Sequence, residues 1–143
     1  MTSLLDVNVL VALAWPNHVH HAAATSWFRA RHRSGWATCP VTESGFLRVS
    51  SNRRVIPTAR TVGEALDVLR ALRAQPGHSF WPDDVSLATA EEIDLARVAG
   101  YRQVTDAHLL CLAIRRQGRL ATFDHALASF TSVPEQVELL SMI

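Results

Sequence analysis

The run Leu4-Leu5-Asp6-Val7-Asn8-Val9-Leu10-Val11 places one carboxylate and one amide among apolar residues near the N-terminus. We expect a strand over residues 3–6 and a helix over 8–14, which Trp15-Pro16-Asn17 ends because proline interrupts helical hydrogen bonding. A carboxylate inside apolar sequence resists burial unless it is paired, protonated or bound to a cation. The run therefore predicts a short buried strand that carries a functional acid, Asp6, at its carboxyl end.

Strands and helices alternate along the rest of the chain. Thr61 and Glu64 form the sequence pattern of a capping box at the start of one helix, and apolar residues then recur at helical spacing. The further expected elements are a helix over 20–33, a strand over 35–38, a helix from Pro40, a helix over 61–74, a strand over 78–81, a weak helix over 84–99 that Gly100 ends, a helix over 105–117, and strands over 119–122 and near 136–140. This alternation predicts an α/β fold with a mainly parallel central sheet flanked by helices on both faces. Ligands bind such sheets beyond the carboxyl ends of the strands.

The composition is that of a single soluble domain. The chain has 143 residues, 48% of them hydrophobic, which is enough for a packed core and too many for disorder. The formal net charge of +1 provides no global basic field for nucleic acid. All 14 basic residues are arginine, which we attribute mainly to genome composition, although a cluster such as Arg29, Arg31 and Arg33 also suits phosphate. Cys39 and Cys111 form no metal-spaced pair, and the N-terminal apolar run is short and interrupted. We therefore expect reduced thiols and a cytoplasmic protein without a signal peptide or membrane span.

Three further acids, Glu43, Asp106 and Asp124, stand in contexts unlike ordinary surface charge. Asp6, Asp106 and Asp124 each also suit a helix N-cap, a position that aspartate favours. Glu43 does not, because it shares a helical face with the bulky Phe46 and no Ser or Thr stands three positions before it. An inward glutamate near strand-terminal aspartates indicates a bound cation.

The type of ligand atom selects the kind of metal. Without a Cys/His set, the acids suit Mg²⁺, with Mn²⁺ as a substitute, and not Zn²⁺. His18, His20 and His21 follow a turn with a spacing that matches no zinc motif, so we interpret them as surface or helix-start residues. His108 and His125 adjoin the acids, and we interpret them as partly exposed neighbours. Carboxylate-held metal is typical of phosphodiester hydrolysis, in which it activates a water and stabilises the leaving oxygen.

Four motifs, in order along the chain, carry a specific resemblance. They are Leu5-Asp6-Val7-Asn8, Thr42-Glu43 with Phe46-Leu47-Arg48, Thr105-Asp106-Ala107-His108-Leu109, and Thr122-Phe123-Asp124. With these motifs the chain resembles the PIN-domain ribonucleases, and most of all the VapC-type toxins of bacterial toxin–antitoxin pairs. The match extends over nearly the whole chain, so we expect residues 1–143 to form one PIN domain.

The resemblance implies roles for individual residues. The acidic quartet that binds metal and carries catalysis would consist of Asp6, Glu43, Asp106 and Asp124. Three polar residues would support it: Asn8 by hydrogen bonding in the pocket, and Thr105 and Thr122 by orienting the acids through their hydroxyls. Some relatives carry a further acid near the last motif. Here His125 follows Asp124 and no acid comes before Glu135, which leaves occupancy of a second metal site open.

The resemblance also implies the activity and the partners. The chain would be a Mg²⁺-dependent endoribonuclease in which a metal-activated water attacks the phosphorus and leaves a 5′-phosphate and a 3′-hydroxyl. Candidate substrates are tRNA, rRNA and mRNA. A VapB-type antitoxin would wrap the toxin and block its acidic pocket, often with an arginine, and the toxin would form a homodimer.

Two other functions fit parts of the pattern. An aspartyl-phosphate phosphatase would use Asp6 as a nucleophile, but it would carry a second aspartate at position 8, where this chain has Asn8. A PIN-like protein with little catalysis, whose main role is to bind an antitoxin or RNA, is the other alternative. The four intact acids argue against a degenerate pocket. RNA cleavage that EDTA abolishes would distinguish a metal-dependent nuclease from such a binding protein.

Overall fold

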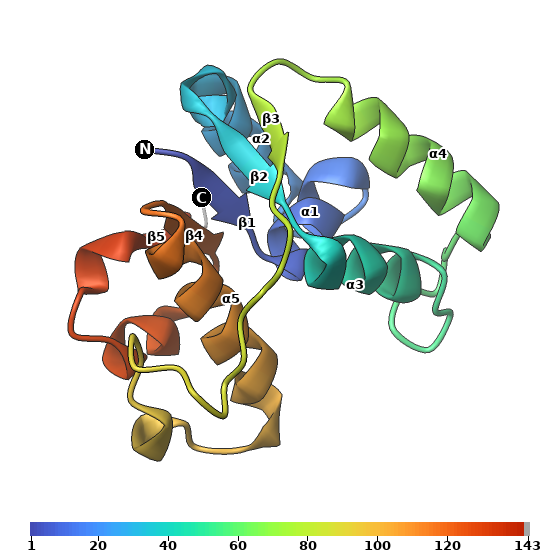
Figure 1. Cartoon of the computed structure of the whole chain (residues 1–143). Coiled ribbons are helices and arrows are strands. Elements are labelled where there is room, and N and C mark those ends of the chain that lie inside the picture. Colours follow the sequence, from blue (N-terminus) through green and yellow to red (C-terminus); the bar gives the residue numbers. More distant parts are fainter. Residues whose placement is uncertain (142–143) are drawn as a thin grey trace.

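Five short parallel strands form the central sheet, in the order β3-β2-β1-β4-β5 (Figure 1). The computed structural model describes residues 1–141. The strands are β1 (Ser3–Leu5), β2 (Trp36–Thr38), β3 (His78–Phe80), β4 (Arg119–Thr122) and β5 (Val137–Leu139). From β1 the chain builds outward to β2 and β3 on one side, and later to β4 and β5 on the other. The order therefore reverses between β1 and β4, and the carboxyl ends of these two strands are the expected ligand site.

Four helices agree with the expected elements to within two residues at each end, and the helix expected from Pro40 begins there. The helices are α1 (Val7–Ala14), α2 (His21–Arg31), α3 (Pro40–Ser50), α4 (Val62–Arg73) and α5 (Val104–Arg115). At the start of α4, the backbone N–H of Glu64 donates to the Thr61 hydroxyl at 3.1 Å, as the capping pattern predicts. Within residues 1–141, none of the helices is long and apolar enough to cross a membrane. The α/β fold with a parallel sheet is confirmed.

The weak helix expected over 84–99 is wrong. Only Leu95–Arg97 form a single 3₁₀ turn there, and Ile93 pairs with Thr131 in an isolated antiparallel bridge. The apolar residues of the segment, such as Val85 and Leu87, pack one by one against the layer that contains α5. Packing of an extended segment against the core has therefore overridden a weak local helical pattern.

The central strands β1, β2 and β4 are buried, and neighbouring residues of each strand point to opposite faces of the sheet. Leu4, Ala37 and Leu120 belong to the cluster that includes α5 and buried Cys111. Leu5, Trp36 and Ala121 belong to the opposite cluster, which also contains apolar residues of α1, α2, α3 and α4. Cys39 and Cys111 are free thiols. One helix thus covers one face and four helices cover the other (Figure 1).

Gly45 brings α3 close to the start of α1. A Cβ atom at this position would lie 2.6 Å from Cγ2 of Val7, so only glycine allows the observed approach. The first turn of α3 begins at Pro40, and the backbone N–H of Cys39 donates to the Thr42 hydroxyl at 2.9 Å. This packing directs the amino end of α3, which carries Glu43, toward the carboxyl end of the sheet.

Candidate metal centre

Asp6 follows β1 directly and is almost fully buried, with 5% of its surface exposed. It occupies the N-cap position of α1, but its side chain makes no capping hydrogen bond to the helix. Its Oδ2 instead accepts a hydrogen bond from the Thr122 hydroxyl at 2.9 Å. Burial raises the pKa of Asp6, and the hydrogen bond from Thr122 opposes that rise. Tertiary contacts rather than helix capping therefore account for the placement of this carboxylate.

Asp124 lies just beyond the end of β4 and is linked to Asp6 through Thr122. Its backbone N–H donates to the Thr122 hydroxyl at 3.0 Å. Its Oδ1 accepts from the backbone N–H of Ala126 at 2.9 Å and so caps the 3₁₀ helix His125–Phe130. Among residues 1–141 no hydrogen bond engages Oδ2, so capping occupies only one oxygen of this carboxylate. Thr122 therefore orients the acids at the ends of two adjacent strands.

Asp106 approaches the same place from the first turn of α5. Burial, followed by the charges of Asp6 and Asp124, raises its pKa to about 7. The charge of Asp124 also raises the pKa of Asp6. The three aspartates thus form one electrostatically coupled cluster, built from the ends of β1 and β4 and the start of α5.

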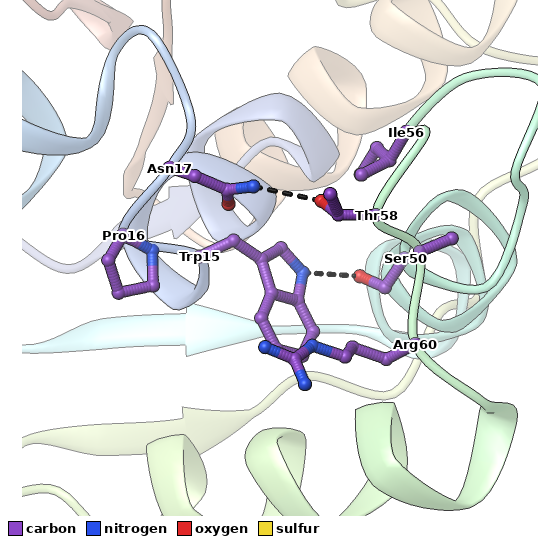
Figure 2. A pocket seen from close by; sticks show the side chains of 8 residues that line it. Trp15, Pro16, Asn17, Ser50, Ile56, Thr58 and Arg60 are labelled. Carbon is purple, nitrogen blue, oxygen red and sulfur yellow. Dashed lines mark hydrogen bonds between the residues drawn. The ribbon is translucent and has the colours of Figure 1, made fainter.

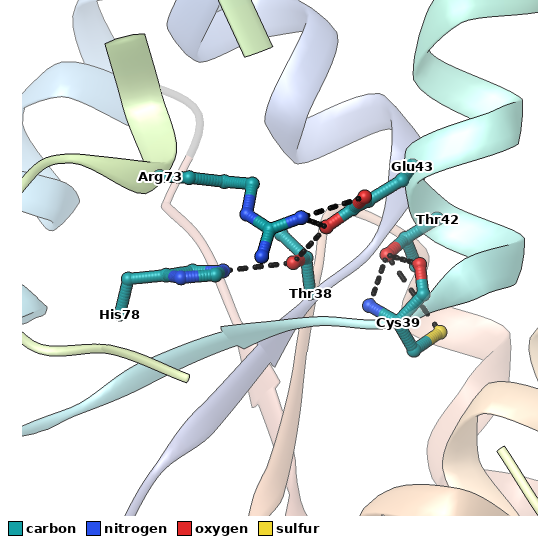
Figure 3. Close-up of polar contacts among 6 residues, drawn as sticks. All are labelled: Thr38, Cys39, Thr42, Glu43, Arg73 and His78. Carbon is teal, nitrogen blue, oxygen red and sulfur yellow. Dashed lines mark hydrogen bonds and ion pairs between the residues drawn. The ribbon is translucent and has the colours of Figure 1, made fainter. Parts of the chain in front are cut away.

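Glu43 is paired with an arginine of the chain itself (Figure 3). Arg73 Nη1 donates to Oε2 at 3.2 Å and to Oε1 at 3.3 Å, and the Thr38 hydroxyl donates to Oε2 at 2.6 Å. His78 Nε2 lies 2.8 Å from the same hydroxyl oxygen. The cation that an inward glutamate requires is therefore present as Arg73, from the last turn of α4. The charge of Glu43 is not among the causes that raise the pKa of Asp6 or Asp106.

The supporting residues expected from sequence occupy different settings. Thr122 is buried between two acids, whereas Asn8 and Thr105 are exposed. In the part of the chain that the structure describes, neither Asn8 nor Thr105 makes a side-chain hydrogen bond. His108 Nε2 lies 2.5 Å from Asp83 Oδ2, and His125 is exposed. Among the described residues, neither histidine makes a hydrogen bond to Asp6, Asp106 or Asp124.

The cluster has the donor chemistry of a hard divalent cation. Its oxygens come from carboxylates. Burial and mutual repulsion raise the pKa of Asp6 and Asp106 by disfavouring their charged forms, and a bound cation would offset both effects. Across residues 1–141, no group of three His, Cys, Asp or Glu side chains converges closely enough to hold an ion in the conformation described. Binding therefore requires Asp6, Asp106 and Asp124 to turn toward a common point, against the mutual repulsion that a cation relieves.

The histidines near the start of α2 also have other partners. His18 Nδ1 accepts from the backbone N–H of His20 at 3.0 Å, and His21 Nδ1 lies 2.8 Å from the carbonyl oxygen of Ala12. These contacts agree with their interpretation as residues of a turn and a helix start.

Two residues at the site escape sequence reasoning. Thr38 is the last residue of β2, which pairs with β1. The only sequence signal for it is weak: it stands two residues before Pro40, where a helix begins, so a strand is expected to end there. Arg73 carries no signal at all, since it lies 30 residues beyond Glu43 and looks like any solvent-facing arginine of an amphipathic helix. Only the packing of α4 against α3 brings it to the acid.

With this geometry in place, comparison with known proteins identifies the family. The model of the PIN domain matches residues 3–132. The chain belongs to the PIN domain family.

Its curated relatives include several ribonucleases of Mycobacterium tuberculosis. Ribonuclease VapC39 is 54% identical over 132 residues, covering 92% of this chain and 95% of that protein. Ribonuclease VapC38 is 53% identical over 145 residues, covering 99% of both chains. Ribonuclease VapC44 is 42% identical over 134 residues, covering 94% of this chain and 93% of that protein. The resemblance to VapC-type PIN-domain ribonucleases is confirmed.

Proposed function

We propose that this chain is a Mg²⁺-dependent endoribonuclease that acts as the toxin of a toxin–antitoxin pair. The observation that carries the proposal is the cluster of Asp6, Asp106 and Asp124 at the switch point of the sheet, in which Thr122 links Asp6 and Asp124 by hydrogen bonds. Membership of the PIN domain family and the likeness to proteins named Ribonuclease VapC support the same activity.

In this proposal the aspartates hold the metal and Thr122 sets their orientation. The Thr122 hydroxyl donates to Asp6 and accepts from the backbone of Asp124, so it fixes two ligands relative to each other. When bound, Mg²⁺, or Mn²⁺ in its place, would supply positive charge for an anionic phosphodiester and would lower the pKa of a water. Desolvation of Asp6 strengthens its attraction for a cation, because a buried charge is poorly screened.

Glu43 is the fourth acid of the proposed site, and it has a competing partner. Its carboxylate would exchange Arg73 for the metal while keeping the hydrogen bond from Thr38. Arg73 is partly exposed, with 41% of its side chain accessible, so it can withdraw into solvent at small cost. No acid follows Asp124 before Glu135, so we assign a single ion to the aspartate cluster.

We extend the proposal to a VapB-type antitoxin and a homodimer, on the likeness to proteins named VapC. Charge supports the antitoxin in particular. An acidic cluster that repels RNA phosphates in the absence of metal attracts an arginine, as the pairing of Glu43 with Arg73 illustrates within the chain.

The test is to map the ends of RNA after incubation with purified protein. Wild type with Mg²⁺ is expected to give discrete cuts with 5′-phosphate and 3′-hydroxyl ends, and EDTA is expected to abolish them. Asp6→Asn keeps the shape of the side chain and the contact with Thr122, so it is the matched variant and is expected to be inactive. Cleavage that persists in EDTA or in folded Asp6→Asn would overturn the proposal. RNA binding without any cleavage would favour the alternative of a binding protein.

A further inference from the structure

A preformed pocket lies at the carboxyl ends of α1 and α3 (Figure 2). Asp6 and Glu43 stand at the amino ends of the same two helices. It has a volume of about 330 Å³ and a mostly apolar lining. Its walls are the turn that follows α1 and the loop between α3 and α4. The lining residues used below are Trp15, Asn17, Ser50, Thr58 and Arg60.

The indole of Trp15 is held in one orientation. Its Nε1–H donates to the buried Ser50 hydroxyl at 2.9 Å, and its ring is parallel to that of Phe46, with centroids 6.2 Å apart. Asn17 Nδ2 donates to Thr58 Oγ1 at 2.9 Å and joins the two loops that form the walls. Figure 2 shows both hydrogen bonds and the guanidinium of Arg60 beside the indole. The pocket therefore presents a rigid aromatic surface, which lowers the entropic cost of binding a flat ligand.

The rim of the pocket is cationic. Arg60 is the charged residue of its lining. A second hollow of about 430 Å³ adjoins the pocket, shares Arg60 with it and adds Arg53. Its one acid, Glu64, pairs with Arg60 at 3.7 Å, but both side chains are more than half exposed, so water screens the pair. The charge of this rim complements an anion such as phosphate.

An aromatic surface beside a cationic hollow matches the two parts of a nucleotide. Unpaired bases stack on aromatic side chains, and arginine binds the phosphates between them. The guanidinium carbon of Arg60 lies 5.8 Å from the indole centroid, so a base that stacks on Trp15 would displace this exposed side chain from the ring. The displaced guanidinium would then bind the adjacent phosphate.

The pocket is also within reach of a strand bound at the acids. Helix α1 begins directly after Asp6 and ends directly before Trp15. At about 1.5 Å of rise per residue, its eight residues place the pocket about 12 Å from Asp6 along the helix. The same relation holds on α3, between Glu43 near its start and Ser50 at its end.

We propose that this pocket binds an unpaired base and an adjacent phosphate of single-stranded RNA, as a subsite a short distance from the bond that is cut. The inference rests on the proposed nuclease function and specifies its substrate as RNA with an unpaired stretch. Trp15 stacks on the base, and Arg53 and Arg60 bind the phosphate.

The test measures binding in EDTA, where no cleavage occurs. The probe is a fluorescein-labelled single-stranded RNA of mixed sequence, ~12 nucleotides long, which is within the usual range of single-strand binding sites. Trp15→Leu keeps apolar volume and removes the stacking surface, and it is expected to weaken binding about five- to 150-fold. Arg53→Gln and Arg60→Gln alter only exposed side chains, and each is expected to weaken binding and reduce the salt dependence by about one phosphate contact. Arg97→Gln removes the same charge from another exposed ion pair, with Asp94, and is expected to bind like wild type.

The outcomes separate the subsite from the catalytic proposal. Arg53→Gln and Arg60→Gln binding the single strand like wild type would overturn the subsite, whatever happens to Trp15→Leu. The subsite would also be overturned if the variants kept the RNA affinity of wild type but lost dimerisation or antitoxin binding. In that case the pocket would be a protein-docking site. Weaker RNA binding by these variants, in a protein whose wild type cuts no RNA with Mg²⁺, would support the subsite and reject the nuclease.

Discussion

Arg73 Nη1 lies 3.2 Å from Oε2 of Glu43, so the last turn of α4 neutralises an acid near the start of α3. Thr38 and His78 extend this contact into a short polar chain at the ends of β2 and β3 (Figure 3). The guanidinium also lies 5.3 Å from the centroid of the Phe80 ring. An arginine of the chain thus pairs with the acid that the resemblance assigns to metal, so the proposed metal would have to compete with it.

Arg73→Gln is expected to strengthen Mg²⁺ binding, because it removes the cation that competes for Glu43. Isothermal titration calorimetry of wild type and variant measures the change. The free energy of unfolding is expected to change by no more than about 1 kcal/mol, since a partly exposed ion pair contributes little. Arg70→Gln, three residues earlier on the same helix, is the control. Equal Mg²⁺ affinity in Arg73→Gln and wild type would show that Glu43 does not contribute to the metal site.

Mg²⁺ affinity is expected to fall as the pH is lowered below 7. Asp106 has a pKa of about 7, so a cation must displace a proton from it in this range. The affinity is expected to decrease by up to about tenfold per pH unit for one displaced proton. Titrations at pH 6 and pH 8 check this, and Asp106→Asn should lose most of the dependence.

The metal-free protein should show the opposite trend in stability. The folded pKa of Asp106 lies above its ordinary value of 3.8, so the folded state binds more protons than the unfolded state between pH 4 and pH 7. Stability therefore decreases as the pH rises through this window. Urea unfolding in EDTA measures the trend, and the difference between wild type and Asp106→Asn isolates the contribution of this group. A wild-type stability that rises relative to Asp106→Asn over the same window would contradict the prediction.

Thr122→Val is expected to weaken both the fold and the metal site. It keeps the shape of the side chain but removes the hydrogen bond to buried Asp6, which costs about 1–3 kcal/mol in free energy of unfolding. Loss of a residue that orients metal ligands typically lowers metal affinity by about 10- to 100-fold. Thr122→Ser retains the hydroxyl and serves as the control. If Thr122→Val bound Mg²⁺ as tightly as Thr122→Ser, the orienting role would be wrong.

Gly45→Ala is expected to destabilise the protein by about 1–3 kcal/mol, since the added Cβ would lie 2.6 Å from a methyl group of Val7. This direction is opposite to the helix propensities, which favour alanine over glycine by about 1 kcal/mol. Gly63→Ala in α4 is the matched control, because no neighbour lies closer than 3.9 Å there, and it is expected to be neutral or stabilising. Thermal unfolding compares the two, and Val7→Ala should restore part of the loss in a double variant.

Local patterns were sufficient to predict most of the fold. The apolar runs that end at Asp6 and Asp124, together with the helical spacing before and after Asp106, indicate parallel strands and helices whose ends meet at one edge of a sheet. The structure has this sheet and brings the three aspartates near one another. The segment 84–99 did not follow its local pattern, because its apolar residues are stabilised by contacts with α5 rather than by neighbours in sequence.

The inward acid Glu43 shows where the sequence and the tertiary structure each contribute. The sequence alone shows that Glu43 lies among apolar residues. A carboxylate in that setting requires a positively charged partner. The identity of that partner, Arg73, depends on how α4 packs against α3, because a contact between residues 30 positions apart produces no periodic pattern in the sequence. The pocket at Trp15 has the same origin, since its walls come from two loops that meet only after α1 and α3 have packed. Burial and strand or helix type are consequences of neighbouring residues, whereas the pairing of charges and the shape of cavities arise from segments that are distant in the chain.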